Sequence, residues 1–156
     1  MISVTIQTAD FDTSAEIDSA TKDNLGIGAV ATFIGKVRGE VDGRPLQSMT
    51  LEHYPGMTET ELTTIAKAAY ERFQLSTVRI VHRVGELTPG NNIVLVIATA
   101  PHRQDAFDGC AFLMDYLKTR APFWKKEVTK DGKGQWVDAR QSDDVARDRW
   151  DEPQQR

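Results

Sequence analysis

The apolar run from Ile93 to Ala98 constrains the fold more than any other feature of the chain. The Pro89-Gly90 turn precedes this run and Pro101 follows it, and its six residues are far fewer than the ~20 that span a bilayer. A short run without a polar face is typical of a strand that is covered on both faces. We therefore predict a central strand over 93–99.

Alternation of apolar and polar residues predicts the other strands. Four of them cover residues 2–7, 29–37, 47–53 and 78–84. Two more, over 123–129 and 135–137, flank Asp131-Gly132-Lys133-Gly134, which is a β-hairpin signal. Turn-forming and charged residues at 39–45 predict a loop that could act as a lid.

Capping and helical spacing predict three main helices. Thr13 and Glu16 have capping-box spacing and predict a short helix there. The same spacing at Thr58 and Glu61 predicts a longer helix, and a third helix is expected over 104–119. The buried stripe of this third helix is expected to contain Phe107, Cys110, Met114 and Leu117.

The order of these elements, β-α-β-β-α-β-β-α-β-β, predicts an α+β fold. We expect a mixed or antiparallel sheet with helices packed to one side, in an α/β-hammerhead-like arrangement, plus a small β-hairpin subdomain. A length of 156 residues fits a single domain. We place this domain at 1–150 and predict a frayed C-terminal tail at 151–156.

Composition excludes several classes of function. The formal net charge is −4, which argues against a general nucleic-acid binder. Cys110 is the only cysteine, so a disulfide framework and a multi-thiolate zinc site are excluded, and its place on a buried stripe predicts a core residue. The three histidines lack metal-ligand spacing and no dinucleotide loop is present, so we expect no metal and no cofactor. The first residues do not resemble a signal peptide, which predicts a cytoplasmic location away from membranes.

The segment Lys118–Lys126 has the most unusual composition. It holds four cations and no acidic residue, and the first acidic residue after it is Glu127. A solvated helix end is one interpretation, because cations there complement the helix dipole by about 0.3–1 kcal/mol each. However, Pro122 stiffens the corner and Phe123-Trp124 anchors the lysines that follow, which favours a preorganised site for a small anion.

Two further basic positions extend this hypothesis. His102-Arg103 lies where the central strand ends and a helix begins, which is a favoured position for an anion, although His102 could also be a cap or a polar core residue. Lys36 and Arg38 end another strand. His53 and His82 lie on apolar strand faces, and we predict that both are core residues. The residues thus predict an anion pocket with lysines that uses no metal and no thiol nucleophile.

Several blocks of the sequence carry a resemblance to a known family. They extend over nearly the whole chain, and the lysine-rich block is the most specific. The blocks are Thr32–Arg38, Leu51–Met57, His82–Leu87, His102-Arg103, Met114–Glu127 and Trp136–Arg140. Together they resemble the catalytic subunit of molybdopterin synthase.

The resemblance implies a sulfur transferase that converts cyclic pyranopterin monophosphate into molybdopterin by forming a dithiolene. The sulfur would arrive as a thiocarboxylate at the C-terminal Gly-Gly of a small ubiquitin-like partner. A heterotetramer is implied, in which two copies of this chain form a dimer with a small subunit at each outer end. An amine near the thiocarboxylate can stabilise an oxyanion or move a proton.

The resemblance also implies which residues form the site. We expect Lys118 and Lys125 to be catalytic. The substrate-binding positions are Lys36, Val37, Arg38, His102, Arg103, Lys118, Lys125, Lys126 and Glu127. Further candidates are Arg140, Met114 and Phe33.

The ends of one helix separate these positions within a single chain. The 15 residues between Arg103 and Lys118 span roughly 22 Å of helix. Two antiparallel copies would bring the opposite helix ends together, so we predict a pocket that two chains share.

Two alternative functions remain open at this point. One is a binding module for anions or single-stranded RNA, with Phe123 and Trp124 as stacking platforms. The other is a non-catalytic scaffold for a ubiquitin-like partner.

Overall fold

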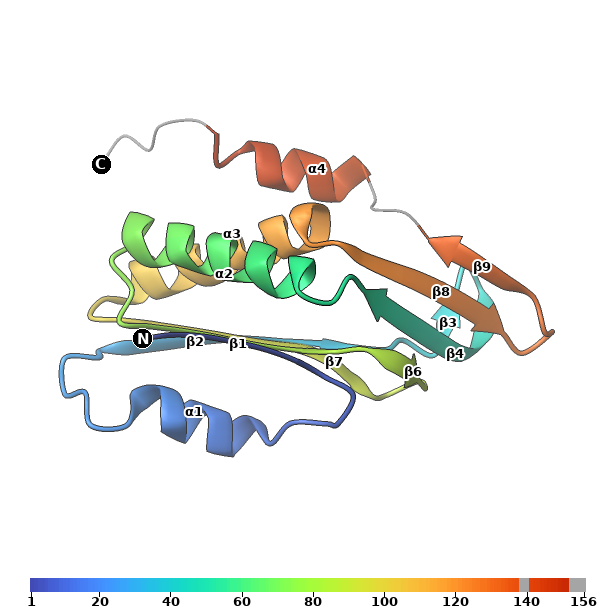
Figure 1. The fold of residues 1–156 in the computed structure, drawn as a ribbon, viewed down its shortest axis with the longest axis horizontal. Coiled ribbons are helices and arrows are strands. Elements are labelled where there is room, and N and C mark those ends of the chain that lie inside the picture. The colour runs from blue at the N-terminus through green and yellow to red at the C-terminus, as the bar shows by residue number, and fades with distance from the viewer. Residues whose placement is uncertain (138–140, 152–156) are drawn as a thin grey trace.

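Strand β7 (Asn92–Ala100) lies inside a four-stranded sheet in the computed structural model, which describes residues 1–137 and 141–151 (Figure 1). The strand order is β1-β5-β7-β2; β1 and β5 are parallel, and the other pairs are antiparallel. The remaining bounds are Ile2–Gln7 for β1, Ala29–Lys36 for β2 and Thr77–Arg83 for β5. Every β7 side chain from Val94 to Ala100 is buried, which confirms the predicted central strand.

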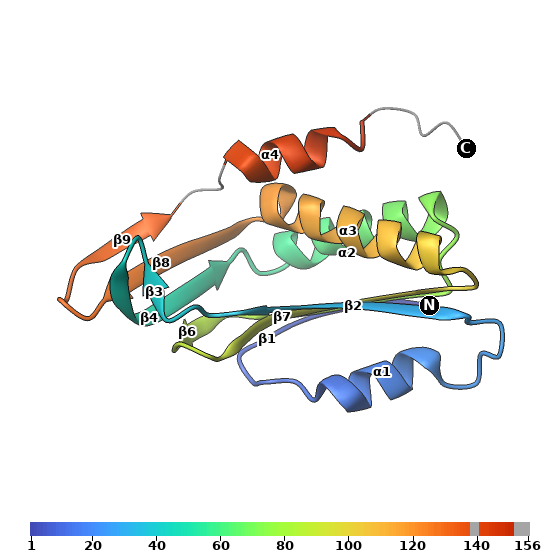
Figure 2. The same ribbon diagram turned by 180° about the vertical axis from the view of Figure 1, so that it is seen from behind.

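Helices cover both faces of this sheet. Helices α2 (Met57–Arg72) and α3 (Arg103–Arg120) lie on one face, with α4 (Gln141–Asp148) outside α3 (Figure 1). Helix α1 (Thr13–Thr21) lies on the other face, as the view from behind also shows (Figure 2). The α+β class with a mixed sheet is confirmed. The expected placement of helices on one side describes only α2 to α4, because the sheet has a second apolar face that α1 must bury. That face presents Val81, Leu95 and Ile97.

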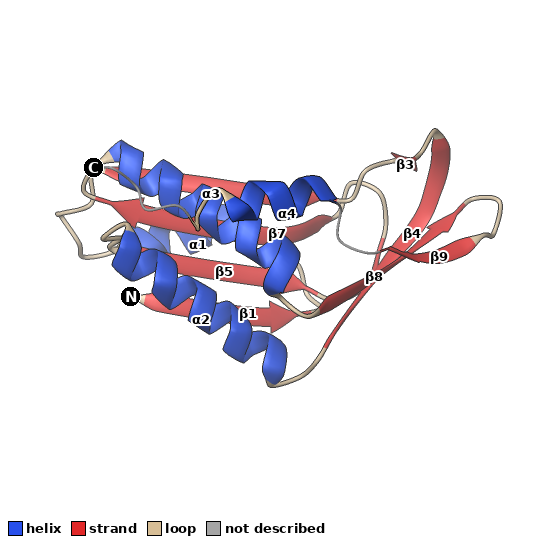
Figure 3. Cartoon of the chain, turned by 90° about the horizontal axis from the view of Figure 1, so that it is seen from above, coloured by secondary structure: helices blue, strands red, loops and turns tan. Residues whose placement is uncertain are grey.

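A second sheet extends beyond the helical layer and contains the predicted hairpin (Figure 3). Its strands are β3 (Glu40–Val41), β4 (Arg44–His53), β6 (Gly85–Leu87), β8 (Phe123–Thr129) and β9 (Gly134–Val137). Residues 39–45, expected to be a loop, instead form the β3–β4 hairpin, because Asp42 and Gly43 adopt positive φ angles of 50° and 75° in its turn. A small separate core supports this sheet; it comprises Val37, Leu46, Met49, Leu51 and Leu87.

The helix N-termini differ from the predicted capping boxes. Asp12, not Thr13, caps α1, and its Oδ1 accepts a hydrogen bond from the Ala15 N–H at 3.0 Å. Helix α2 begins one residue before Thr58. The Thr58 hydroxyl accepts from the Tyr54 N–H at 2.9 Å and donates to the Pro122 carbonyl at 3.0 Å. Thr58 therefore joins the start of α2 to the corner between α3 and β8.

Helix α3 buries a face that differs from the predicted stripe. Cys110 and Leu117 are buried as expected, but Phe107 is 62% exposed. The buried face also contains Gly109, which lies so close to Leu75 that a Cβ there would be 2.8 Å from Leu75 Cδ1. No described helix is long and apolar enough to span a membrane.

The C-terminal end of the described chain is anchored by Trp150. Its ring is buried against Phe73 and Phe112, and its indole N–H donates to Asp115 Oδ2 at 2.7 Å. Asp151 is exposed, and the rest of the predicted tail, 152–156, lies outside the described residues.

Candidate active site

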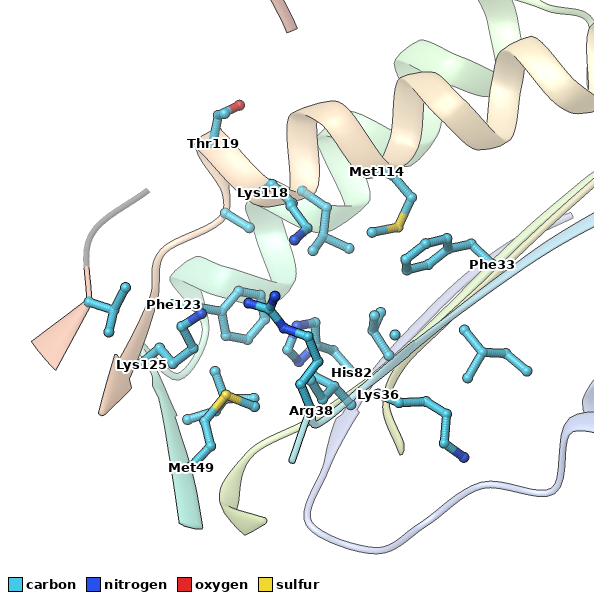
Figure 4. Close-up of a pocket in the computed structure, with 18 residues that line it drawn as sticks. Phe33, Lys36, Arg38, Met49, His82, Met114, Lys118, Thr119, Phe123 and Lys125 are labelled. Carbon is cyan, nitrogen blue, oxygen red and sulfur yellow. The ribbon is translucent and has the colours of Figure 1, made fainter. Parts of the chain in front are cut away.

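A cavity of about 610 Å³ lies between the C-terminal end of α3, the end of β2 and the second sheet (Figure 4). Its polar lining comes from six side chains: Lys36, Arg38, His82, Lys118, Thr119 and Lys125. Apolar side chains make up the rest, among them Phe33, Met49, Met114 and Phe123. The cavity thus combines a group of cations with flat and flexible apolar groups.

Lys118 projects into the cavity from the last turns of α3. The helix ends at Arg120, and Ala121 is extended with a ψ of 129°, because a residue before proline is disfavoured in the helical region. Pro122 then directs the chain into β8 beside the cavity. The corner predicted at Pro122 is present.

Strand alternation separates the residues of β8 into two groups. Phe123 and Lys125 line the cavity, whereas Trp124 and Lys126 lie on the other face of the strand. Lys126, which we expected to bind substrate, is therefore outside the cavity in this chain. The exposed ring of Trp124 and the ring of Phe123 also lie on opposite faces, so they do not form one stacking platform.

A buried carboxylate holds the Lys125 ammonium. Lys125 Nζ lies 3.3 Å from Glu127 Oε1, two residues along the same face of β8. Glu127 is only 5% exposed, and its Oε2 atom has no hydrogen-bond partner among the described residues. Glu127 thus belongs to the layer beneath the cavity wall, from which it fixes the position of Lys125.

Arg38 and Lys118 differ from Lys125 in having no partner within residues 1–137 and 141–151. Both side chains are exposed, and neither makes a hydrogen bond or an ion pair within the described part of the chain. Figure 4 shows their charged ends directed into the same region as that of Lys125. Three cations therefore converge, two of them available to an anion.

Lys36 lies on the rim and points away from these three cations (Figure 4). Its Nζ donates a hydrogen bond to Asn92 Oδ1 at 3.1 Å, and the Asn92 amide donates to Asp10 Oδ1 at 3.1 Å. This chain of polar contacts gives Lys36 a protein partner outside the cation group.

His82 forms part of the cavity floor, where it was predicted only as a core residue. Its ring is 4% exposed and stacks on Phe123 with 3.9 Å between centroids and 16° between planes. Burial, with a smaller contribution from the neighbouring His53, lowers the pKa of His82 to about 4, so the ring is neutral near pH 7. Strand alternation places His82 on the same face as Ile80, which lies in the core, so the sequence indicated the orientation of the His82 side chain. It did not indicate that this face borders a cavity.

The other predicted residues are distributed as follows. Phe33 and Met114 line the cavity, as does Thr119, which the sequence did not indicate. Val37 is buried in the small second core and is not among the residues that line the cavity. His102 and Arg103 are exposed at the opposite end of α3, and Arg140 lies outside the described residues. Within residues 1–137 and 141–151, no three His, Cys, Asp or Glu side chains are grouped to hold a metal.

Comparisons with known proteins agree over nearly the whole chain. The family model described as MoaE protein matches residues 6–120. The molybdopterin synthase catalytic subunit of Rhizobium meliloti (strain 1021) is 51% identical over 150 residues, which cover 96% of this chain and 96% of the relative.

Solved structures extend the similarity to the fold. The molybdopterin biosynthesis MoaE protein from Burkholderia ambifaria MC40-6 has a TM-score of 0.83 at 52% identity, with 98% of this chain and 100% of that chain covered. Molybdopterin synthase from Staphylococcus aureus has a TM-score of 0.78 at 30% identity, with 85% of this chain and 94% of that chain covered.

Proposed function

This chain belongs to the MoaE family, the catalytic subunits of molybdopterin synthase, and we propose that the cavity beside Lys118 is where it transfers sulfur to a pterin. The family and the sulfur-transferase function predicted from the sequence are confirmed. The assignment of the cavity and of roles to its residues is our proposal. The observation that carries it is the convergence of Arg38, Lys118 and Lys125 beside an apolar wall.

The cavity suits a pyranopterin monophosphate. Arg38 offers a guanidinium fork to a phosphate, and it has no competing protein partner among the described residues. Phe33, Met114 and the stacked pair of His82 and Phe123 provide apolar surface for a flat heterocycle. The substrate therefore has a charged and an apolar contact in the same cavity.

The two lysines have different roles in this proposal. The thiocarboxylate sulfur forms a bond to a carbon of the pterin side chain as an oxygen substituent leaves that carbon with negative charge, and water then cleaves the bond between the sulfur and the carrier's carbonyl carbon, which releases the carrier as a carboxylate. Lys118, whose ammonium has no partner among the described residues, stabilises the negative charge that develops or supplies a proton. Lys125 is positioned by Glu127 and keeps a fixed positive charge beside the reacting groups.

The sulfur must come from outside this chain. Cys110 is the only cysteine in the sequence, it does not line the cavity, and burial raises the pKa of its thiol to about 11. A thiol of this kind is a poor nucleophile at neutral pH, because the reactive form is the thiolate. We therefore propose a small ubiquitin-like sulfur carrier as the partner, with its C-terminal Gly-Gly thiocarboxylate extending into the cavity. We also propose a cytoplasmic location, where the sulfur carrier stays reduced.

A second copy of the chain would complete the cavity. His102 and Arg103 are at the far end of α3 from Lys118, so one chain does not bring them together. The edge strand β2 and α3 expose large apolar side chains that a partner copy would cover: Val30, Ile34 and Phe107. A two-fold axis near the middle of α3 would place Arg103 of one chain beside Lys118 of the other.

Reconstitution tests the proposal. The purified chain is mixed with a thiocarboxylated carrier and cyclic pyranopterin monophosphate, and dithiolene product is measured. We expect Lys118→Ala to lose turnover while it keeps its thermal stability, and Lys67→Ala, an exposed lysine on α2, to behave like the wild type. A scaffold without catalytic function predicts the opposite result, namely that Lys118→Ala retains turnover.

A further inference from the structure

We infer that His82 contacts the substrate directly: its Nε2 atom accepts a hydrogen bond from an N–H donor of the pterin ring. The inference rests on the proposed function and adds to it the group that recognises the heterocycle. It follows from three observations, which concern the tautomer of His82, its fixed position and the chemistry of its neighbours.

The hydrogen bonds of His82 define its tautomer. Nδ1 lies 2.8 Å from the carbonyl oxygen of Arg83. A carbonyl only accepts, so Nδ1 carries the proton and donates, and the lone pair of the neutral ring is on Nε2. Nε2 has no hydrogen-bond partner among the described residues, yet it is not one of their fully enclosed unpartnered atoms. This acceptor is therefore open to the cavity that His82 lines.

The position of the ring is fixed before any ligand binds. The ring stacks on Phe123 at 3.9 Å, and the neighbouring strand β7 pairs with β5 through His82 and Val94. Because burial keeps the ring neutral near pH 7, the Nε2 lone pair persists at that pH. A preorganised acceptor loses little conformational entropy when it binds a donor.

The three cations that converge in the cavity offer only donors. Arg38, Lys118 and Lys125 carry no acceptor atom. The Thr119 hydroxyl donates to the Asp115 carbonyl at 2.9 Å and points away from these cations (Figure 4), and Glu127 lies beneath Lys125 in an ion pair. Donors suffice for a phosphate, but a reduced pterin also presents N–H groups on its ring and its amino substituent. His82 is the side chain of this group whose free acceptor suits those N–H groups.

Substitution at His82 separates heterocycle recognition from phosphate recognition. In His82→Asn the amide can still donate to the Arg83 carbonyl, but the Nε2 acceptor is lost. We expect calorimetry to show about tenfold weaker binding of cyclic pyranopterin monophosphate, as the loss of a hydrogen bond in a desolvated site predicts. Thermal unfolding of the variant checks that the fold is retained. Wild-type affinity in a folded His82→Asn overturns the inference.

A spectroscopic measurement on the wild type is independent of how the variant folds. The chain has three histidines, so ¹⁵N resonances of their rings are readily assigned. We expect the His82 Nε2 resonance to move in the direction of hydrogen-bond acceptance when the pterin phosphate binds, and the same movement in Arg38→Ala once that variant is saturated. Binding with an unmoved Nε2 resonance overturns the inference. Failure of the wild type to bind the pterin phosphate at all instead overturns the proposed function.

Discussion

Acid should destabilise this protein through His82. Burial lowers the pKa of His82 from its ordinary 6.5 to about 4, and the neighbouring His53 contributes in the same direction. The unfolded chain therefore binds a proton at this residue below pH 6.5, whereas the folded chain binds it only near pH 4. Between these values the proton favours the unfolded state.

The size of the effect follows from the two pKa values. The free energy of unfolding is unaffected by His82 above pH 6.5 and falls as the pH drops toward 4. At 1.36 kcal/mol for each tenfold change, the full loss is about 3 kcal/mol, of which about 2.5 kcal/mol is lost by about pH 4.5. A loss of this size is a large fraction of the stability of an ordinary domain.

Urea unfolding at about pH 7 and about pH 4.5 measures this loss. The wild type is compared with His82→Asn, in which the position no longer titrates while the other groups do so in both proteins. We expect the wild type to lose about 2.5 kcal/mol more than the variant over this range. His102→Asn, which removes an exposed histidine, should behave like the wild type. Equal losses in the wild type and His82→Asn would refute the conclusion that His82 is buried in its neutral form.

Three further predictions concern the cations, the second chain and the C-terminal anchor. Arg38→Ala should raise the half-saturating concentration of pterin phosphate more than it slows the saturated reaction, which steady-state kinetics can separate. Mixing inactive Lys118→Ala with inactive Arg103→Ala should restore partial activity once the chains exchange, because some mixed dimers contain one intact pocket; no recovery after verified exchange contradicts a shared site. Trp150→Ala should lower the free energy of unfolding by about 3–5 kcal/mol in urea titrations, and a change below about 1 kcal/mol would mean that the indole is not packed in the core.

Local sequence patterns were sufficient where a neighbouring residue determines the structure. The apolar run at Ile93 predicted the central strand because a strand without a polar face must be buried on both sides. The Asp131–Gly134 signal predicted the β8–β9 hairpin, in which Gly132 adopts a φ of 83°. Pro122 predicted the corner after α3 because the helical region is disfavoured for the residue before a proline.

Positions that depend on distant parts of the chain could not be predicted in this way. Phe107 satisfies the helical spacing of a buried residue, but the close contact between Gly109 and Leu75 turns another face of α3 toward the sheet. Similarly, the side of the sheet that α1 covers depends on which face α2 and α3 have already occupied.

The sequence by itself determined the family, the order of most elements and the presence of a cation-rich segment, because these depend on residue identity and on spacing along the chain. Only the tertiary structure decided which of those cations share a cavity. The pleat of β8 directs Lys125 inward and Lys126 outward, and Asn92 holds Lys36 away from the group. It also brought His82 onto the cavity floor, since stacking on Phe123 joins residues 41 positions apart in the sequence. Contacts of this range arise from packing, which no local pattern encodes.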